Sequence, residues 1–341
     1  MSLRTRRADS RSTSVAAAVA AMSVSVAMWL SLQPHRLVDL FRVAAWASQW
    51  LHGAQLYGAT TDVDYPPWAI VTLSPLAWLP SGLLPWCWVA CNLTALAIVA
   101  RRLSRSRRLV FYLLIAAGAM RTLNQFTLVS LAFAVVGTTA VTRFSPVWLG
   151  LSLIKPQIGG VFWLHAVWTR QWKLAISSLV APGVLLGVYA SRAHVSMWEA
   201  LHAYAGSIGV QYGEVLWGQT EVTSWLRVLW PYAAPVLVTT AVAVIVFATL
   251  ARTRPQLGLS LASLLSVRHL SYDLVLLLPW VATLEGRALW IASALLIADP
   301  AAILGMVAPG SVGALHADRI AVLAFWAVAS VALKPIGRPV E

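Results

Sequence analysis

The sequence is poor in cysteine and in charge. Its 341 residues include two cysteines, Cys87 and Cys91, which lie four apart in an apolar stretch. Two thiols make neither a disulfide framework nor a zinc site, so we expect both to be packing residues inside a helix. Only 11% of the residues are charged, and no Gly-rich phosphate loop of the nucleotide-binding kind is present.

The abundant residues are those of an integral membrane protein. Hydrophobic residues make up 59% of the chain, and its mean hydropathy is +0.74. Its apolar runs are cut by Pro, Gly or Arg, so we expect some short or broken helices. No repeat of fixed period is evident. We therefore predict a single all-α, polytopic membrane domain over residues 1–341, with about twelve transmembrane helices.

The basic residues set the expected topology. A net charge of +13 could suggest nucleic-acid binding, but the basic residues lie mainly at helix ends, where the positive-inside rule places them, and we reject that function. Residues 1–13 form a basic tail, and the run Val15–Leu32 is too long for a signal-peptide core, which predicts a retained first helix. Five Arg within residues 101–108 are expected in the cytoplasm, as are both termini. Residues 34–81 and 192–230 are then the large outer loops.

The first outer loop keeps charge beside the lipid boundary. A carboxylate such as Asp39 is costly there unless it faces water, a partner or a substrate. Apolar residues recur on one face of residues 40–51, which predicts a helix lying in the membrane interface. A second interfacial helix is predicted over residues 67–80, broken at Pro75 and Pro80. The alternative is a solvated loop that only joins two helices.

Two later apolar segments carry polar residues at their centres. Residues 145–169 contain Lys155 followed by Pro156, and residues 256–285 contain a polar run that ends at Asp273. Each segment is predicted to break into two short helices whose junction opens outward. For the first, the alternative is one long kinked helix with Lys155 buried at its centre.

The acidic residues are unevenly distributed across this topology. Of the twelve, three are expected on the cytoplasmic side: Asp9, Glu285 and Glu341. Acidic residues have little influence on topology, so this asymmetry is independent information. It predicts that any chemistry takes place on the outer face.

A polar cluster is predicted at that face. The loop and the broken helices bring five residues to one level: Asp39, Gln125, Lys155, His269 and Asp273. A cation in a membrane-edge cavity suits a phosphate, and a nearby carboxylate suits proton removal from a sugar hydroxyl. The structural alternatives are an ion-paired lysine at 155, a packing histidine at 269, and pairing of Asp273 with Arg268 or Lys155.

Asp62 and Asp64 form a further acidic pair. An Asp-Val-Asp sequence suits a metal ion, but two exposed aspartates before Pro66-Pro67 are equally typical of a turn. We predict no metal site and no cofactor, with a divalent metal as the open alternative.

The order of several short motifs resembles glycosyltransferase family 87. These motifs span residues 36–285: Asp39, Gly53-Ala-Gln-Leu-Tyr57, Tyr65-Pro66-Pro67, Ser-Pro-Leu-x-x-Leu-Pro at 74–80, Asn124-Gln125, Lys155-Pro156, Gly218-Gln219-Thr220 and Ser271-Tyr272-Asp273-Leu. The family implies the GT-C fold and a polyprenyl-phosphate sugar donor. No single motif is specific, and the resemblance depends on their order.

The resemblance implies a role for each residue. Asp39 would be the general base that deprotonates the acceptor hydroxyl, which attacks the anomeric carbon and inverts its configuration. The residues implied to hold the donor phosphate are Lys155, Arg121 and Arg268. Those implied to bind substrate are Tyr65, Gln125, Gln219, His269, Tyr272 and Asp273.

The chain also departs from the family pattern. The Gly-Gln-x-Asn of the family stands here as Asn124-Gln125-Phe126-Thr127, and the Asn-Gln-Ser of the second loop as Gly218-Gln219-Thr220, which leaves those two assignments open. We expect transfer of mannose to a lipid-linked or cell-envelope glycan on the outer face of the plasma membrane. The alternatives are an arabinofuranosyl donor, a transporter or flippase for a lipid-linked sugar, and a non-catalytic scaffold that retains the fold.

Overall fold

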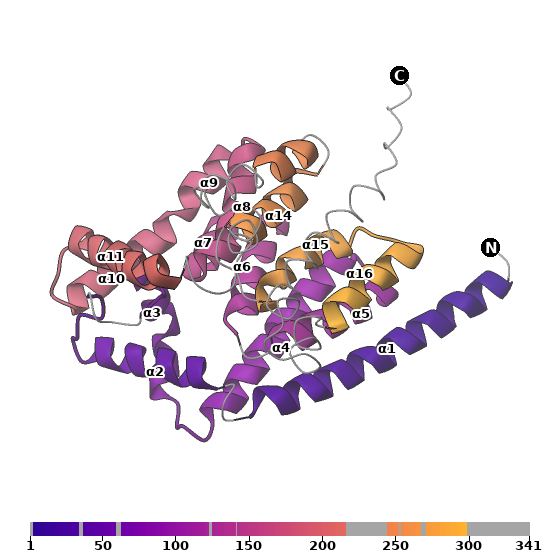
Figure 1. Ribbon diagram of the computed structural model, residues 1–341, viewed down its shortest axis with the longest axis horizontal. Helices are drawn as coiled ribbons and strands as arrows, with labels where there is room; N and C mark the ends of the chain where they lie inside the picture. Colours follow the sequence, from indigo (N-terminus) through magenta and orange to yellow (C-terminus); the bar gives the residue numbers. More distant parts are fainter. Residues whose placement is uncertain are drawn as a thin grey trace.

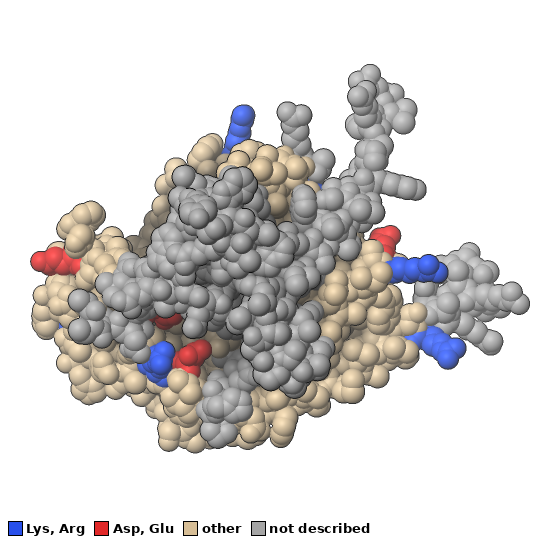
Figure 2. Space-filling view, in the orientation of Figure 1, with Lys and Arg blue, Asp and Glu red and all other residues tan. Residues whose placement is uncertain are grey.

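The described part of the chain consists of helices, turns and short connections. The computed structural model describes residues 3–33, 37–58, 63–122, 125–140, 142–215, 244–251, 254–266 and 271–298, and no strand occurs among them. Large apolar side chains such as Trp29, Trp86 and Ile176 are exposed. On the face shown in Figure 2, charged side chains of the described residues are confined to a few places. Such a surface suits contact with lipid.

Three described helical stretches are long and apolar enough to cross a membrane. They are Ser10–Ser31 within α1 (Leu3–Ser31), Leu84–Ser104, which is α4, and Trp172–Arg192, which joins α9 (Trp172–Ser178) and α10 (Val180–Arg192). The predicted first helix and the crossing after the first outer loop are confirmed as apolar helices. About twelve crossings stays a prediction, because residues 216–243 and 299–341 lie outside the described residues.

The central helices pack around α5 (Arg108–Thr122). It contacts α1, α4 and α16 (Gly286–Ala298), and Figure 1 shows α1 along one edge of the bundle beside them. The next helix, α6 (Thr127–Thr139), packs on α4. The core between these helices is made of fully buried aliphatic side chains, including Leu96, Leu113, Leu114, Leu128 and Leu131. α6 is therefore held rigidly, and its first residue belongs to the site described below.

The first outer loop is structured, as predicted. It forms α2 (Val38–Leu51), α3 (Pro67–Leu73) and the 3₁₀ helix η2 (Ser74–Trp78). α2 buries the apolar face expected from its periodicity: Leu40, Val43, Trp46, Ala47 and Trp50. Pro67 starts α3, where its missing N–H costs no hydrogen bond, and the break predicted at Pro75 falls where α3 gives way to η2. α10 and α11 (Met197–Val215) lie against α3.

The segment around Lys155 is broken rather than kinked. α7 (Ser145–Leu151) and η3 (Ser152–Ile154) precede Lys155, and α8 (Pro156–Trp168) follows it. Lys155 has φ −125° and ψ 90°, an extended conformation that interrupts the helix, as expected before a proline. The alternative of one kinked helix is therefore wrong.

The second broken segment also forms more than one helix. It forms α14 (Pro255–Ser266), η4 (Ser271–Leu277) and the short α15 (Leu278–Val281). α14 packs on α8, and η4 contacts α5, α6 and α14. α6 thus contacts both broken segments, although they are far apart in sequence.

The basic run at residues 101–108, which includes the turn between α4 and α5, marks one end of this bundle. Arg107 Nη1 lies 3.7 Å from Glu285 Oε1, and Arg107 Nη2 donates to the carbonyl of Ala282. The run is thus in contact with residues 282–285 after α15. α5 begins at this end with Arg108, and four residues separate its last residue from Thr127, so the N-terminus of α6 lies at the other end.

The cysteines do not behave as predicted. Cys87 and Cys91 are free thiols on α4, and both are exposed. They were expected to pack inside because their stretch is apolar. In a membrane protein an apolar residue is as stable against lipid as in the core, so apolar sequence alone does not fix the buried face.

Candidate functional site

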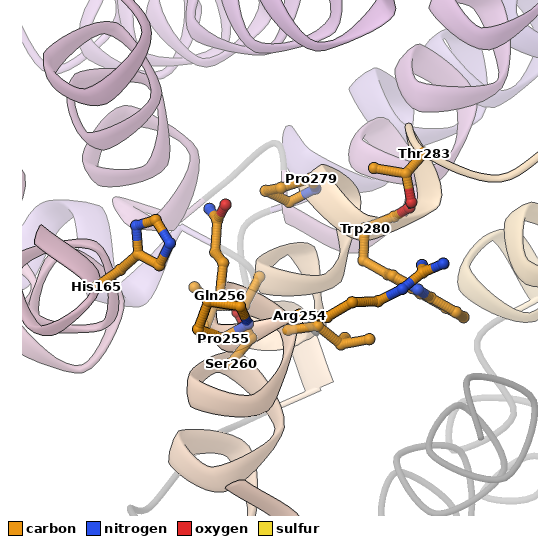
Figure 3. Close-up of a pocket in the computed structure, with 10 residues that line it drawn as sticks. His165, Arg254, Pro255, Gln256, Ser260, Pro279, Trp280 and Thr283 are labelled. Atoms are coloured by element: carbon orange, nitrogen blue, oxygen red, sulfur yellow. The ribbon is translucent and has the colours of Figure 1, made fainter. Parts of the chain in front are cut away.

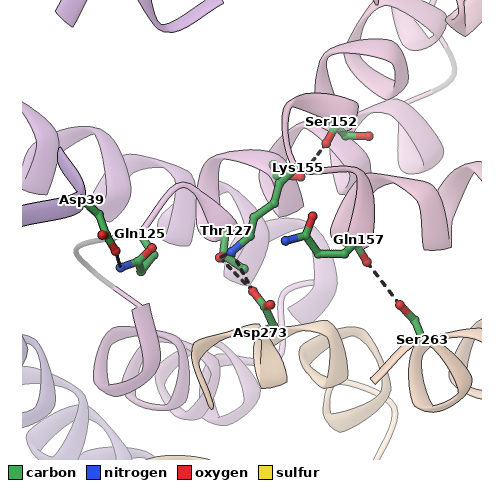
Figure 4. A network of polar contacts seen from close by, with 9 residues as sticks. Asp39, Gln125, Thr127, Ser152, Lys155, Gln157, Ser263 and Asp273 are labelled. Carbon is green, nitrogen blue, oxygen red and sulfur yellow. Dashed lines mark hydrogen bonds and ion pairs between the residues drawn. The ribbon is translucent and has the colours of Figure 1, made fainter. Parts of the chain in front are cut away.

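Three buried polar side chains form a cluster where α6, the break at Lys155 and η4 meet (Figure 4). Lys155 Nζ is 2.9 Å from Asp273 Oδ1 and donates to Thr127 Oγ1 at 2.6 Å. The Thr127 hydroxyl in turn donates to the same Asp273 oxygen at 3.1 Å. The exposed fractions are 5% for Lys155, 0% for Thr127 and 1% for Asp273. A buried charge needs a partner and hydrogen bonds, and each member of this triad supplies them to the others.

The backbone around Lys155 is fixed by neighbouring helices. Ser130 Oγ on α6 donates to the Ser152 carbonyl at 2.6 Å, and Trp68 Nε1 on α3 donates to the Leu153 carbonyl at 2.8 Å. Gly159 on α8 lies so close that an added Cβ would sit 2.4 Å from the Ser152 carbonyl oxygen. The first outer loop therefore holds the turn that presents Lys155, and a glycine makes the close approach possible.

A second polar pair lies beside the triad. Gln125 Nε2 donates to Asp39 Oδ2 at 3.1 Å, across 86 positions in sequence. Asp39 lies in the first turn of α2 and is exposed, whereas Gln125 is 7% exposed. The amide orients the carboxylate while a hydroxyl can still approach from solvent. Because Gln125 is two residues before Thr127, one short segment contacts both the exposed carboxylate and the buried lysine.

Asp64 is a further carboxylate in this neighbourhood. Burial by surrounding protein raises the pKa of Asp64, its own backbone N–H and Lys155 lower it, Asp39 raises it again, and Arg42 lowers it. Asp64 nevertheless remains exposed to solvent. The charges of Asp39, Arg42 and Lys155 therefore all act on Asp64.

Aromatic rings pack around Phe126, the residue between Gln125 and Thr127. Tyr65 and Phe126 meet edge to face with ring centroids 5.2 Å apart, and Trp88 lies 4.2 Å from Phe126. The Tyr57 hydroxyl donates to the Tyr65 carbonyl at 2.7 Å, and Trp46 of α2 lies 6.4 Å from the Tyr65 ring. Such contacts fix Phe126, and with it Gln125 and Thr127 on either side.

The structure brings half of the predicted site residues together: Asp39, Tyr65, Gln125, Lys155 and Asp273. The side chains of the others lie outside its described part: Arg121, Gln219, Arg268, His269 and Tyr272. Asp62 also lies outside it. Sequence reasoning missed Thr127, although the departure from the family pattern at that position was a signal. Within the described residues, no three His, Cys, Asp or Glu side chains are grouped so as to hold a metal ion.

A separate cavity of about 490 Å³ lies farther along α8 (Figure 3). Its lining includes His165, Arg254, Gln256 and Trp280. His165 is ten residues beyond Lys155, a rise of about 15 Å along a helix. None of the predicted residues that the structure describes lines this cavity, so we do not assign it to the candidate site.

Comparison with known proteins gives one match. No curated protein and no solved structure matches the chain. The model of glycosyltransferase family 87 matches residues 64–279, more than half of the sequence. The match includes Asp64, Gln125, Lys155 and Asp273 and begins after Asp39. The described residues form helices, three of them long and apolar enough to span a membrane, which agrees with that family, and the chain belongs to glycosyltransferase family 87.

Proposed function

We propose that this membrane glycosyltransferase moves mannose from a polyprenyl phosphate to a lipid-linked or cell-envelope glycan on the outer face of the plasma membrane. The observation that carries the proposal is the segment from Gln125 to Thr127, which contacts both Asp39 and Lys155. Displacement of a phosphate by a hydroxyl requires a base for the hydroxyl and a cation for the phosphate, and this segment contacts one candidate for each role.

Asp39 is the general base in this proposal. Its carboxylate takes the proton of the acceptor hydroxyl, and the oxygen attacks the anomeric carbon as the bond to the donor phosphate breaks. The electron pair of that bond leaves with the phosphate, and the configuration inverts. Gln125 holds one carboxylate oxygen and so limits the orientations of the base.

Lys155 stabilises the leaving phosphate in this proposal. Its ammonium is fixed by Asp273 and Thr127, so little reorganisation is needed when negative charge develops on the phosphate. Arg121 and Arg268 complete the phosphate site in this proposal, with Gln219, His269 and Tyr272 on the substrate.

The reaction is tested with purified protein in lipid vesicles. Wild type is given polyprenyl-phosphate mannose with a radiolabelled sugar, together with a membrane lipid extract, and labelled glycolipid is the expected product. Product from the arabinofuranosyl donor alone would replace mannose with the rival sugar. If neither donor gives product while labelled lipid crosses the bilayer, the protein is a flippase and the proposal is wrong.

A further inference from the structure

A groove runs between α4, α6 and α7, away from the candidate site. It encloses about 1030 Å³. From Cys91 to Arg101, both in its lining, α4 rises about 15 Å, half the thickness of the hydrocarbon core of a bilayer. The groove therefore has the length of one leaflet.

The walls of the groove are apolar. Ile98 is exposed along α4, Val129 and Val136 face it from α6, and the rings of Phe133 and Trp148 stack with centroids 5.6 Å apart. These two rings come from different helices, α6 and α7, and together form the aromatic part of the wall. Such a wall suits a hydrocarbon chain and offers little to a polar ligand.

One end of the groove is cationic. Arg101 and Arg102 line it in the last turn of α4, and both are exposed. Arg107 of the same basic run is engaged by Glu285 and by the Ala282 carbonyl. By contrast, no carboxylate of the described residues pairs with Arg101 or Arg102. Two guanidinium groups at the polar end of an apolar groove complement a phosphate that carries acyl chains.

We propose that this groove binds one anionic phospholipid of the leaflet that surrounds the 101–108 end. An acyl chain lies along Ile98, Val136 and the Phe133–Trp148 wall, and the phosphate lies on Arg101 and Arg102. This binding site does not depend on the sugar-transfer reaction.

The test is native mass spectrometry of the full chain, released from bilayers with equal amounts of phosphatidylglycerol and phosphatidylcholine. Wild type should retain phosphatidylglycerol in preference to phosphatidylcholine. Arg101→Gln together with Arg102→Gln should lower that preference by about tenfold, from the attraction that two cations exert on an anionic lipid. Thr94→Trp, which adds an indole at an exposed position of the groove, should lower retention of both lipids.

A matched control removes two other positive charges. Arg170 lies in the turn that follows α8 and Lys173 lies just after it; both are exposed, and neither lines the groove. Arg170→Gln together with Lys173→Gln should therefore leave the lipid preference unchanged. Equal retention of both lipids by wild type would overturn the proposal. An unchanged preference in the Arg101/Arg102 variant, or an equal loss in the control, would overturn it as well.

Discussion

Lys155 Nζ and Asp273 Oδ1 lie 2.9 Å apart, 118 positions apart in sequence, and both side chains are almost completely buried. The pair connects the two broken segments of the chain. Because the Thr127 hydroxyl binds both partners, the pair also fixes the start of α6. Residues 125–127 are therefore held by an ion pair as well as by apolar packing.

Replacing one partner of the ion pair should destabilise the protein more than replacing both partners. Lys155→Met or Asp273→Leu alone leaves one buried charge without its partner, which costs about 3–5 kcal/mol in the free energy of unfolding. The double variant leaves no charge and should be more stable than either single variant. Thermal unfolding in detergent ranks the stabilities of the three variants. A double variant less stable than both single variants would contradict this account of the pair.

The hydrogen bond from Gln125 should affect turnover more than stability. Gln125→Leu removes the amide that orients Asp39, and a bond to a charged group corresponds to a rate loss of about 10- to 100-fold. Sugar transfer at saturating donor measures kcat, and thermal unfolding measures stability. An undiminished kcat in a folded Gln125→Leu variant would show that Asp39 needs no such orientation.

Two adjacent glycines make a matched test of the Lys155 turn. A Cβ at Gly159 would lie 2.4 Å from the Ser152 carbonyl oxygen, whereas a Cβ at Gly160 meets nothing within 4 Å. Gly159→Ala should therefore destabilise the protein by about 1–3 kcal/mol, as overpacking does. Gly160→Ala should be neutral or stabilising, because alanine favours a helix. Thermal unfolding measures the stability of both variants. Equal stabilities would contradict the close approach of Gly159 to the Ser152 carbonyl.

The stability of the protein should depend on Asp64 at mildly acidic pH. Burial raises the pKa of Asp64 from its ordinary value of 3.8, so the folded state binds this proton more tightly than the unfolded state does. Its contribution to stability is present below pH 3.8 and is lost as pH rises toward the folded pKa. Asp64→Asn should abolish this loss and unfold at a higher temperature than wild type at neutral pH. A wild-type pH profile that the substitution leaves unchanged would contradict the prediction.

The sequence predicted the local structure of the site better than its pairing. Pro156 lacks the N–H that a continuous helix requires, so a break at Lys155 could be predicted, with one kinked helix as the alternative. The apolar spacing of residues 40–51 likewise predicted the buried face of α2. Both features depend on near neighbours in the chain.

Long-range pairing could not be read in the same way. Arg268 is closer to Asp273 in sequence than Lys155 is, and the contact of Lys155 with that carboxylate depends on the packing of η4 on α6, which the sequence does not show. Thr127 was missed because a hydroxyl gains its role from the two charges beside it. Asp64 was read as a turn or metal residue, since its neighbours Asp39 and Lys155 reach it only through the tertiary fold.

The most direct test of the account compares wild type with Asp39→Asn in the transfer of radiolabelled mannose from polyprenyl phosphate. Glu199→Gln serves as the control, because Glu199 is an exposed carboxylate that accepts a hydrogen bond from the Ser196 N–H at the start of α11. We predict that Asp39→Asn lowers kcat by about 100-fold or more, the contribution of a general base, with donor binding retained. The control should turn over as wild type does. Full turnover by Asp39→Asn would show that the base is another residue and would contradict the central claim.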